Sequence, residues 1–381
     1  MNTLQINIFI LLKQTRSAIS FLLLILVYFL ASENCNADTL TSYRGINISF
    51  HSSPSNKDFL KISKWGANTV RLVIHADPEN KSYDHIYQSD IKVINEHSFK
   101  KLDSVIRLAS ENNLKVVLST ATFPGSKSSI WKDYNYWRKV ESLWFYISKR
   151  YANNKHVIGF SPIDEPQVAI LNLNAIEKLK MRKGNWIFPN KWKNTPKDYF
   201  SLIKRIGTII NKNAPDKFVI VSGVGLWGNP LNYRWMKPVE IKNAIYSFNF
   251  YLPSAFANGG KKWRPIGSYS STLNKLEIIK ALTPVKIFAK KNSVSVFING
   301  FGLPYHTEGK GAYAWMTDVL DFFEDNQWSW SYFSYSVPFR SPEVKNINGK
   351  NIEYNQNTER LKILIKYWEK NWLSSTGQGN E

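Results

Sequence analysis

The sequence has a single cysteine, Cys35, among 381 residues, which excludes an internal disulfide and a cysteine-rich zinc site. Its six histidines show neither HxH nor HExxH spacing, so we expect no metal. No GxGxxG segment follows the first predicted strand, which argues against a dinucleotide, and we expect no cofactor. Acidic residues are scarce, because 29 Asp and Glu stand against 50 Lys and Arg.

The formal net charge of +21 allows two interpretations. It indicates either an anionic partner, such as a nucleic acid, a lipid surface or an acidic polysaccharide, or lysines spread over a solvated surface. No RRM, KH, zinc-finger or helix-turn-helix motif is present, so we do not expect nucleic-acid binding. A hydrophobic content of 43% and an aromatic content of 14% exclude a disordered chain.

An uncharged apolar run, AISFLLLILVYFLA, occupies residues 18–31. Lys13 and Arg16 precede it, and Cys-Asn-Ala follows at 35–37, which is the pattern of a signal peptide cut after Ala37. We therefore expect export to the periplasm, the cell envelope or the extracellular space. The run is short for a transmembrane helix, but an uncleaved N-terminal anchor is the alternative, and it would be the only contact with a membrane.

Beyond residue 38, apolar β-rich runs alternate with amphipathic helical stretches. The predicted strands are residues 44–50, 69–75, 115–120, 157–163, 217–222, 244–251, 294–298 and 328–335. The predicted helices are residues 55–65, 98–111, 137–151, 196–213, 271–291, 311–325 and 358–372, with no long helix between the fifth and sixth strands. This alternation predicts the α/β class and a (β/α)₈ TIM barrel, with a doubly wound open sheet as the alternative.

The predicted domain organisation is simple. Residues 1–37 form the signal peptide or anchor, residues 38–373 form a single barrel domain, and residues 374–381 form a flexible tail. A Trp-containing insertion at 167–194 follows the fourth strand and is expected to wall a cleft, because barrel active sites lie at such loops. We expect a monomer.

Carboxylates at the ends of barrel strands are candidates for catalysis, and the fourth strand ends in Ile-Asp-Glu-Pro at 163–166. Burial of Glu165 at this place would raise its pKa and suit it to donate a proton near neutral pH. The alternative is a surface carboxylate before a turn proline.

Six segments together resemble glycoside hydrolase family 5, the cellulase-like retaining enzymes. They are RGIN at 44–47, WGANTVR at 65–71, VIGF at 157–160 leading to DEP at 164–166, YSFNFY at 246–251, FINGFG at 297–302 and WSWSY at 328–332. Each motif alone is weak, but six in the family's order are specific.

The resemblance implies two catalytic glutamates, about 5–5.5 Å apart for a retaining mechanism. Glu165 matches the acid/base, whereas the nucleophile position falls on Gly300, which has no side chain to attack a sugar. Arg71 and Tyr251 also match the family. Four further positions depart from its pattern: Ala121 and Asn249 stand where the family has His, Asp164 where it has Asn, and Phe333 where it has Trp.

The resemblance also implies a set of sugar-binding residues. They are Arg71, Asp164, Trp227, Asn249, Tyr251, Trp330 and Phe333. Asp164 is expected to point away from Glu165, because neighbouring residues of a strand face opposite sides, and to accept a hydrogen bond from a sugar hydroxyl. Its charge would raise the pKa of Glu165. Each of Trp227, Trp235, Trp263, Trp328 and Trp330 belongs either to the cleft or to the core.

We therefore expect a carbohydrate-active protein of the O-glycosyl hydrolase class that acts on or binds a β-linked polysaccharide or oligosaccharide, with an acidic one favoured by the positive charge. Without a nucleophile, the family's retaining catalysis is expected to be lost or weakened, as in a pseudoenzyme. One alternative is an active hydrolase whose rebuilt site uses Glu308, from the loop after Gly300. Another is a non-catalytic glycan-binding protein of the cell envelope.

Overall fold

The computed structural model describes residues 43–76, 96–125, 128–168, 172–183, 185–225, 229–258 and 267–371. All of them belong to one of the two units into which the chain divides, Ser42–Glu381. The predicted signal segment 1–37, the tail 374–381 and the residues Trp227 and Trp263 lie outside the described residues.

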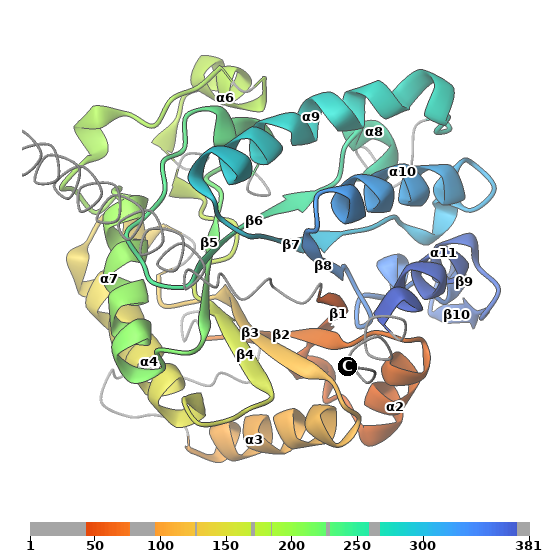
Figure 1. Cartoon of the computed structure of the whole chain (residues 1–381), viewed down its shortest axis with the longest axis horizontal. Coiled ribbons are helices and arrows are strands. Elements are labelled where there is room, and N and C mark those ends of the chain that lie inside the picture. Colours follow the sequence, from red (N-terminus) through yellow and green to blue (C-terminus); the bar gives the residue numbers. More distant parts are fainter. Residues whose placement is uncertain are drawn as a thin grey trace, which may run out of the picture. The chain divides into compact units, whose positions relative to one another are not determined.

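Eight parallel strands form a closed barrel in which each strand pairs with the next and β1 also pairs with β8 (Figure 1). They are β1 Arg44–Ser49, β2 Thr69–His75, β3 Lys115–Thr122, β4 Val157–Ser161, β5 Phe218–Ser222, β6 Ala244–Phe250, β7 Val296–Phe301 and β8 Ser329–Tyr332. The predicted barrel is confirmed, and the open sheet is wrong, because the first and last strands are hydrogen-bonded to each other.

The helices lie around the strands (Figure 1). They are α2 Asn56–Lys64, α3 Glu96–Glu111, α4 Tyr134–Tyr151, α6 Ala175–Arg182, α7 Tyr199–Asn213, α8 Ser254–Ala257, α9 Ser271–Asn292, α10 Ala312–Asp325 and α11 Glu359–Trp368. Short 3₁₀ helices are η1 Phe50–Ser52, η2 Ser129–Trp131, η3 Asn190–Trp192, η5 Pro230–Arg234, η7 Tyr305–Thr307 and η8 Pro338–Arg340. No helix within the described ranges is both long and apolar enough to cross a bilayer.

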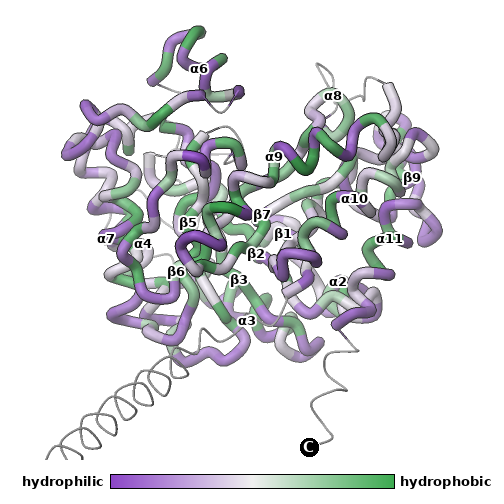
Figure 2. The backbone as a smooth tube through the Cα atoms, turned by 45° about the horizontal axis from the view of Figure 1, so that its top comes forward, coloured by the Kyte–Doolittle hydropathy of each residue, from purple (hydrophilic) through white to green (hydrophobic). Residues whose placement is uncertain are grey.

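The core lies between the strands and the inner faces of these helices. In Figure 2 the hydrophobic segments concentrate on the strands and the hydrophilic ones on the periphery. Trp137 and Trp144 on α4 and Trp368 on α11 are at most 3% exposed and belong to this core. Aromatic side chains account for much of this burial, as their large apolar area favours.

All eight predicted strands are present, with boundaries that differ by a few residues. β4 ends at Ser161, so Asp164 and Glu165 lie in the loop after the strand. The sequence did not predict helix α6 and η3, which lie inside the insertion. It also did not predict the antiparallel hairpin of β9 Val344–Asn348 and β10 Asn351–Tyr354, which follows β8. Between β5 and β6 the described residues contain η5 and no long helix, as predicted.

The N-terminal end of the barrel is held by a buried ion pair that joins β1 to the end of α10. The Arg44 guanidinium donates to both carboxylate oxygens of Glu324, at 2.8 and 2.7 Å. Trp330 Nε1 donates to the same carboxylate at 3.0 Å, and its ring stacks on Trp368. Trp330 is therefore directed outward from β8 into the helix layer.

We expect Glu324→Ala to lower the free energy of unfolding by about 3 kcal/mol, because it leaves a buried guanidinium without its counter-charge. The matched control is Glu240→Ala, which removes the exposed Glu240–Lys204 pair and should leave stability unchanged. Urea denaturation followed by tryptophan fluorescence measures both. Equal losses in the two variants would contradict a special role for the Arg44–Glu324 pair.

Candidate active site

A cavity of about 380 Å³ opens at the C-terminal ends of the barrel strands. Its lining includes six of the residues predicted from the sequence: Arg71, Asp164, Glu165, Asn249, Tyr251 and Phe333. Ala121 lies there too, at the end of β3. These residues come from strands or strand ends spread over more than 260 positions of the chain, and only closure of the barrel brings them together.

Arg71, on β2, is the centre of a buried polar network. Its guanidinium donates to Asp164 Oδ2 at 2.7 Å and to Asn47 Oδ1 at 2.8 Å, and it also contacts Ser119. Asn299 Nδ2 donates to the other Asp164 oxygen at 3.1 Å. Asp164 is thus a neutralised carboxylate with both oxygens bonded, which fixes its position in the cavity wall.

Glu165 lies beside Asp164, and both side chains line the cavity. The expectation that they face opposite sides is wrong, because Glu165 lies beyond the end of β4 and has a φ of 45°. This left-handed conformation is unfavourable for a residue with a side chain, by roughly 1–2 kcal/mol, and directs Glu165 toward the same opening as its neighbour.

The pKa of Glu165 is raised to about 7, first by burial and then by the charge of the adjacent Asp164. A hydrogen bond from Asn249 Nδ2, at 2.7 Å, and the Arg71 charge act in the opposite direction. A carboxyl group with this pKa is partly protonated at neutral pH, which is what a general acid requires.

Gly300 lies on β7 beside Asn249, the residue whose amide binds Glu165. The pairing of β6 with β7 shifts register between Phe248 and Asn249, so that Asn249 is paired with Gly300. A Cβ atom added at Gly300 would lie 3.0 Å from the Tyr251 hydroxyl and 3.1 Å from Asn249 Oδ1, the amide that binds Glu165. A side chain at position 300 would therefore enter the cavity between Tyr251 and the Glu165 partner.

Comparison with known proteins identifies the family. The model of the cellulase family, glycosyl hydrolase family 5, matches residues 33–337. The chain belongs to glycosyl hydrolase family 5. Among its relatives, endoglucanase C of Acetivibrio thermocellus is 20% identical over 311 residues, which cover 71% of this chain and 80% of that protein. Cellulase CelDZ1 of a Thermoanaerobacterium species is 23% identical over 330 residues, with 85% and 70% covered.

Solved structures show the same fold. The structure of Thermotoga maritima Cel5A in complex with cellobiose superposes with a TM-score of 0.65 at 20% identity, covering 85% of this chain and 97% of that one. The cellulose synthase subunit Z from Clostridioides difficile superposes with a TM-score of 0.62 at 23% identity, covering 85% and 99%. The family 5 barrel predicted from the six sequence motifs is therefore confirmed.

Two predicted sugar-binding tryptophans are not part of this family 5 site as described. The prediction that Trp330 binds sugar is wrong. Side chains alternate along β8, and the Trp330 ring is fully buried between the barrel and Trp368. Trp227 lies outside the described residues. Trp328 is also core, packed on Phe323, and Trp235 lies on the outer wall of the barrel.

The alternative nucleophile Glu308 is also wrong. Its Oε1 accepts from Arg360 Nε at 2.7 Å, and its Oε2 accepts from the Glu359 amide at 2.7 Å. Arg360 is fully buried, so it holds the Glu308 carboxylate at the start of α11 and away from the cavity lining. The insertion at 167–194 was expected to wall the cleft. Among its described residues, only Gln167 lines the cavity.

Arg340 was missed by sequence reasoning. It is 2% exposed, lines the cavity from η8, and lies 4.6 Å from the centre of the Tyr251 ring. It donates to the Gly302 carbonyl at 2.9 Å and so ties η8 to the loop after β7. No motif precedes it in the sequence. Asn47 and Asn299 were missed as well, although both lie inside motifs that the sequence analysis quoted.

Among the described residues, no three His, Cys, Asp or Glu side chains come together in a way that could hold a metal ion. The chemistry available in the cavity is therefore that of its own side chains: one carboxyl group with a raised pKa, one ion-paired carboxylate, two arginines and the amides of Asn249 and Asn299.

The raised pKa of Glu165 makes stability depend on pH. The ordinary value is 4.5 and the folded value is about 7, so between these pH values the folded protein binds more protons than the unfolded chain. Stability therefore falls as the pH rises through this window. Glu165→Gln should stabilise the protein at pH 8 by up to about 3 kcal/mol and should have no effect at pH 4.

Thermal unfolding at the two pH values tests this expectation. Glu240→Gln is the control, because Lys204 lowers the pKa of Glu240 and its replacement should bring no gain at pH 8. A Glu165→Gln variant that is equally stabilised at both pH values would rule out titration of Glu165 as the cause.

Proposed function

We propose that this family 5 protein is exported and binds a β-linked polysaccharide at the barrel mouth without the family's retaining catalysis. The observation that carries the proposal is Gly300. Its Cα faces Tyr251 and Asn249 across from Glu165, in the position that the sequence resemblance assigns to the nucleophile. The acid is present, and the group that would form a glycosyl–enzyme bond is absent from this position.

No other carboxylate in the described lining takes over that role. Asp164 is the only acidic side chain there besides Glu165, and Arg71 and Asn299 occupy its two oxygens. Loss of one member of a catalytic unit typically costs about 10⁴-fold in rate, whereas a general acid alone supplies roughly 10²–10⁴-fold. Turnover should therefore be very slow.

The choice of ligand rests on the family and on the relatives. The similar proteins are an endoglucanase and a cellulase, and one similar structure holds cellobiose. A β-linked glucan is accordingly the first ligand to test. The apolar run with basic flanks at the N-terminus supports export, by a cleaved signal peptide or by a retained anchor. We expect a monomer.

Rescue by a small anion tests the empty position. With azide present, a nitrogen should bond to the anomeric carbon of 4-methylumbelliferyl β-cellobioside as the bond to the leaving oxygen breaks. Glu165 gives its proton to that oxygen. The expected product is the α-glycosyl azide, formed at a rate that rises with azide concentration, and NMR of the product measures it. Glu165→Gln should slow the rescued reaction.

Gly300→Glu should create β-glucan hydrolysis with retention of configuration, which the native chain is expected to lack. The hydrolysis rate is expected to rise about 10²-fold over the native chain, below the ~10⁴-fold that a member of a catalytic unit typically supplies. The reason is crowding, because the new Cβ lies 3.0 Å from the Tyr251 hydroxyl and 3.3 Å from Phe333 Cβ. Gly300→Gln is the matched control and should remain inactive.

Two outcomes would overturn the proposal. The first is rapid hydrolysis by the native chain without azide, which would require an active nucleophile. The second is failure to bind cello-oligosaccharides in calorimetry together with failure of azide rescue, which would mean that the barrel mouth is not a β-glucan site.

A further inference from the structure

Three neighbouring cavities lie on the outer wall of the barrel, apart from the active-site cavity. Their volumes are about 870, 550 and 620 Å³. The first and second share Asn194, Ser201 and Lys204, and the second and third share Lys237 and Pro238. These adjoining cavities are together called the outer groove here, and they follow one another from α4 and α7 past the insertion and η5 to α9. None of its lining residues also lines the active-site cavity.

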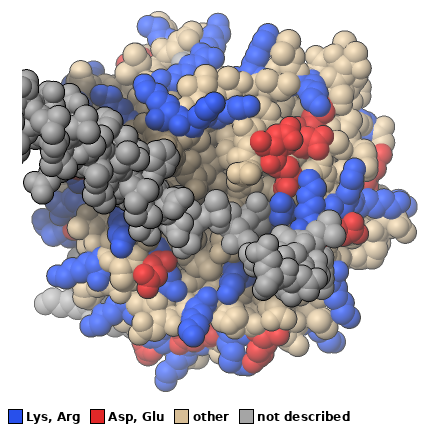
Figure 3. All heavy atoms as spheres, in the orientation of Figure 1, with Lys and Arg blue, Asp and Glu red and all other residues tan. Residues whose placement is uncertain are grey.

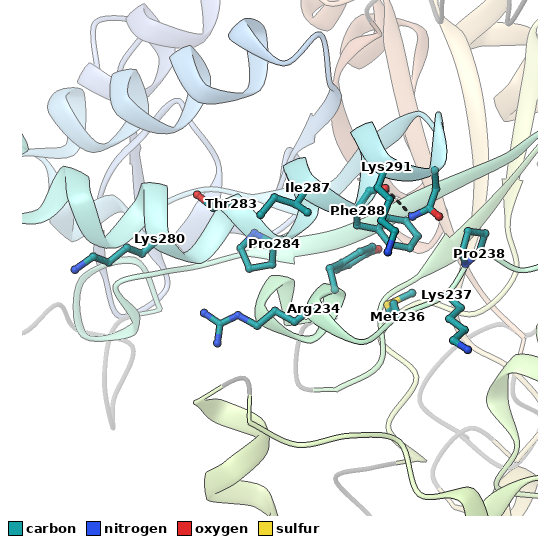
Figure 4. Close-up of a pocket in the computed structure, with 12 residues that line it drawn as sticks. Arg234, Met236, Lys237, Pro238, Lys280, Thr283, Pro284, Ile287, Phe288 and Lys291 are labelled. Carbon is teal, nitrogen blue, oxygen red and sulfur yellow. Dashed lines mark hydrogen bonds between the residues drawn. The ribbon is translucent and has the colours of Figure 1, made fainter.

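The end of the outer groove beside α9 carries unbalanced positive charge. Arg234, Lys237, Lys280 and Lys291 line it, and no acidic residue does so. Figure 4 shows Arg234 and Lys237 on the η5 side, and Lys280 and Lys291 on α9. None of the four pairs with a carboxylate in the described part of the chain. Farther along the groove the charges are balanced, because Lys204 pairs with Glu240 and Arg205 with Glu141.

Positive side chains also predominate over the face of the molecule drawn in Figure 3. In the view of Figure 3, Lys and Arg side chains clearly outnumber Asp and Glu, in keeping with a formal net charge of +21 for the whole chain. Like charges placed together in a cavity repel one another and raise the local potential. An anionic ligand would relieve that repulsion, and a carboxylate is the group that such cations pair with most directly.

The middle of the outer groove carries aromatic rings. Phe188, Phe200 and Trp235 line it and are each partly exposed. Phe188 and Phe200 pack edge to face at 5.1 Å, and Trp186 lies 5.4 Å from Trp235. The rings are thus held in place by their neighbours. A rigid, partly exposed aromatic surface suits the apolar C–H face of a pyranose ring.

We propose that the outer groove binds a strand of anionic polysaccharide, with sugar rings on the aromatic residues and uronate carboxylates over the four cations beside α9. The ligand class rests on the proposed function, which makes a polysaccharide the substance that this family 5 protein meets. The aromatic and the cationic residues line adjoining cavities, which fits a polymer that carries both a sugar face and a charge. The preference for an acidic glycan would then lie on the outer wall and not in the active-site cavity.

Binding of the full chain to polygalacturonate tests the proposal, with fully methyl-esterified polygalacturonate as the neutral counterpart. Affinity electrophoresis at low and high salt measures the dissociation constant. The quadruple variant Arg234→Gln, Lys237→Gln, Lys280→Gln and Lys291→Gln should bind polygalacturonate about tenfold more weakly, as the loss of several exposed charge contacts implies. The native chain should bind the acidic polymer more tightly than the ester, and high salt should weaken this binding.

The matched control removes the same charge elsewhere. Lys100→Gln, Lys101→Gln, Lys350→Gln and Lys362→Gln change four exposed lysines on α3, on the β9–β10 turn and on α11. This variant should keep the native affinity, and both variants should unfold at the native temperature. An equal loss in the control, equal binding of the neutral ester, or binding of phosphatidylglycerol vesicles or duplex DNA in place of polygalacturonate would each overturn the proposal.

The two proposals fail in different ways. The groove variant should still bind cello-oligosaccharides and should still show azide rescue, because its substitutions lie outside the active-site cavity. Groove-dependent binding of polygalacturonate without any response to cello-oligosaccharides or azide would support the outer groove and reject the proposed function. Loss of both activities in the groove variant would reject the outer groove as a separate site.

Discussion

A buried arginine organises the barrel mouth. Arg71 is almost completely enclosed, so its charge requires a close counter-charge and hydrogen-bond acceptors. Asp164 supplies the charge, and Asn47 and Ser119 supply further acceptors. This arrangement fixes the loop after β4, and with it Glu165. Burial, together with the charge of the adjacent Asp164, raises the pKa of Glu165 to about 7, so Glu165 can hold a proton near neutral pH.

The space beside Gly300 keeps its walls although position 300 carries no side chain. Tyr251, Asn249 and Arg340 hold these walls in place. Arg340 lies behind the Tyr251 ring and is bound to the Gly302 carbonyl, so the wall has support from outside the strands. The cavity therefore remains formed, with its acid aligned, and suits binding of a sugar without covalent attack.

Sequence patterns predicted much of the fold and part of the site. Buried strands are short apolar runs, and their alternation with amphipathic helices was enough to place all eight. Glu165 followed from that as a residue at a strand end, and the family resemblance added Arg71, Asn249 and Tyr251. All four line the cavity. Trp330 was misplaced because a strand of alternating polar and aromatic residues does not reveal which face turns to the barrel interior. The orientation of Glu165 was misplaced because its positive φ leaves no mark in the sequence.

The sequence by itself determined the family and the barrel, and the proposed roles of Glu165 and Gly300 also come from it, since all of these depend on residue identity and local order. The tertiary structure alone decided that Glu308 pairs with Arg360, 52 positions away, and that Arg340 supports Tyr251. It also decided that four cations from η5, the segment after it and α9 line one cavity. The physical reason is that a side chain takes its role from its neighbours in space, and closure of the barrel joins segments that are far apart in the chain.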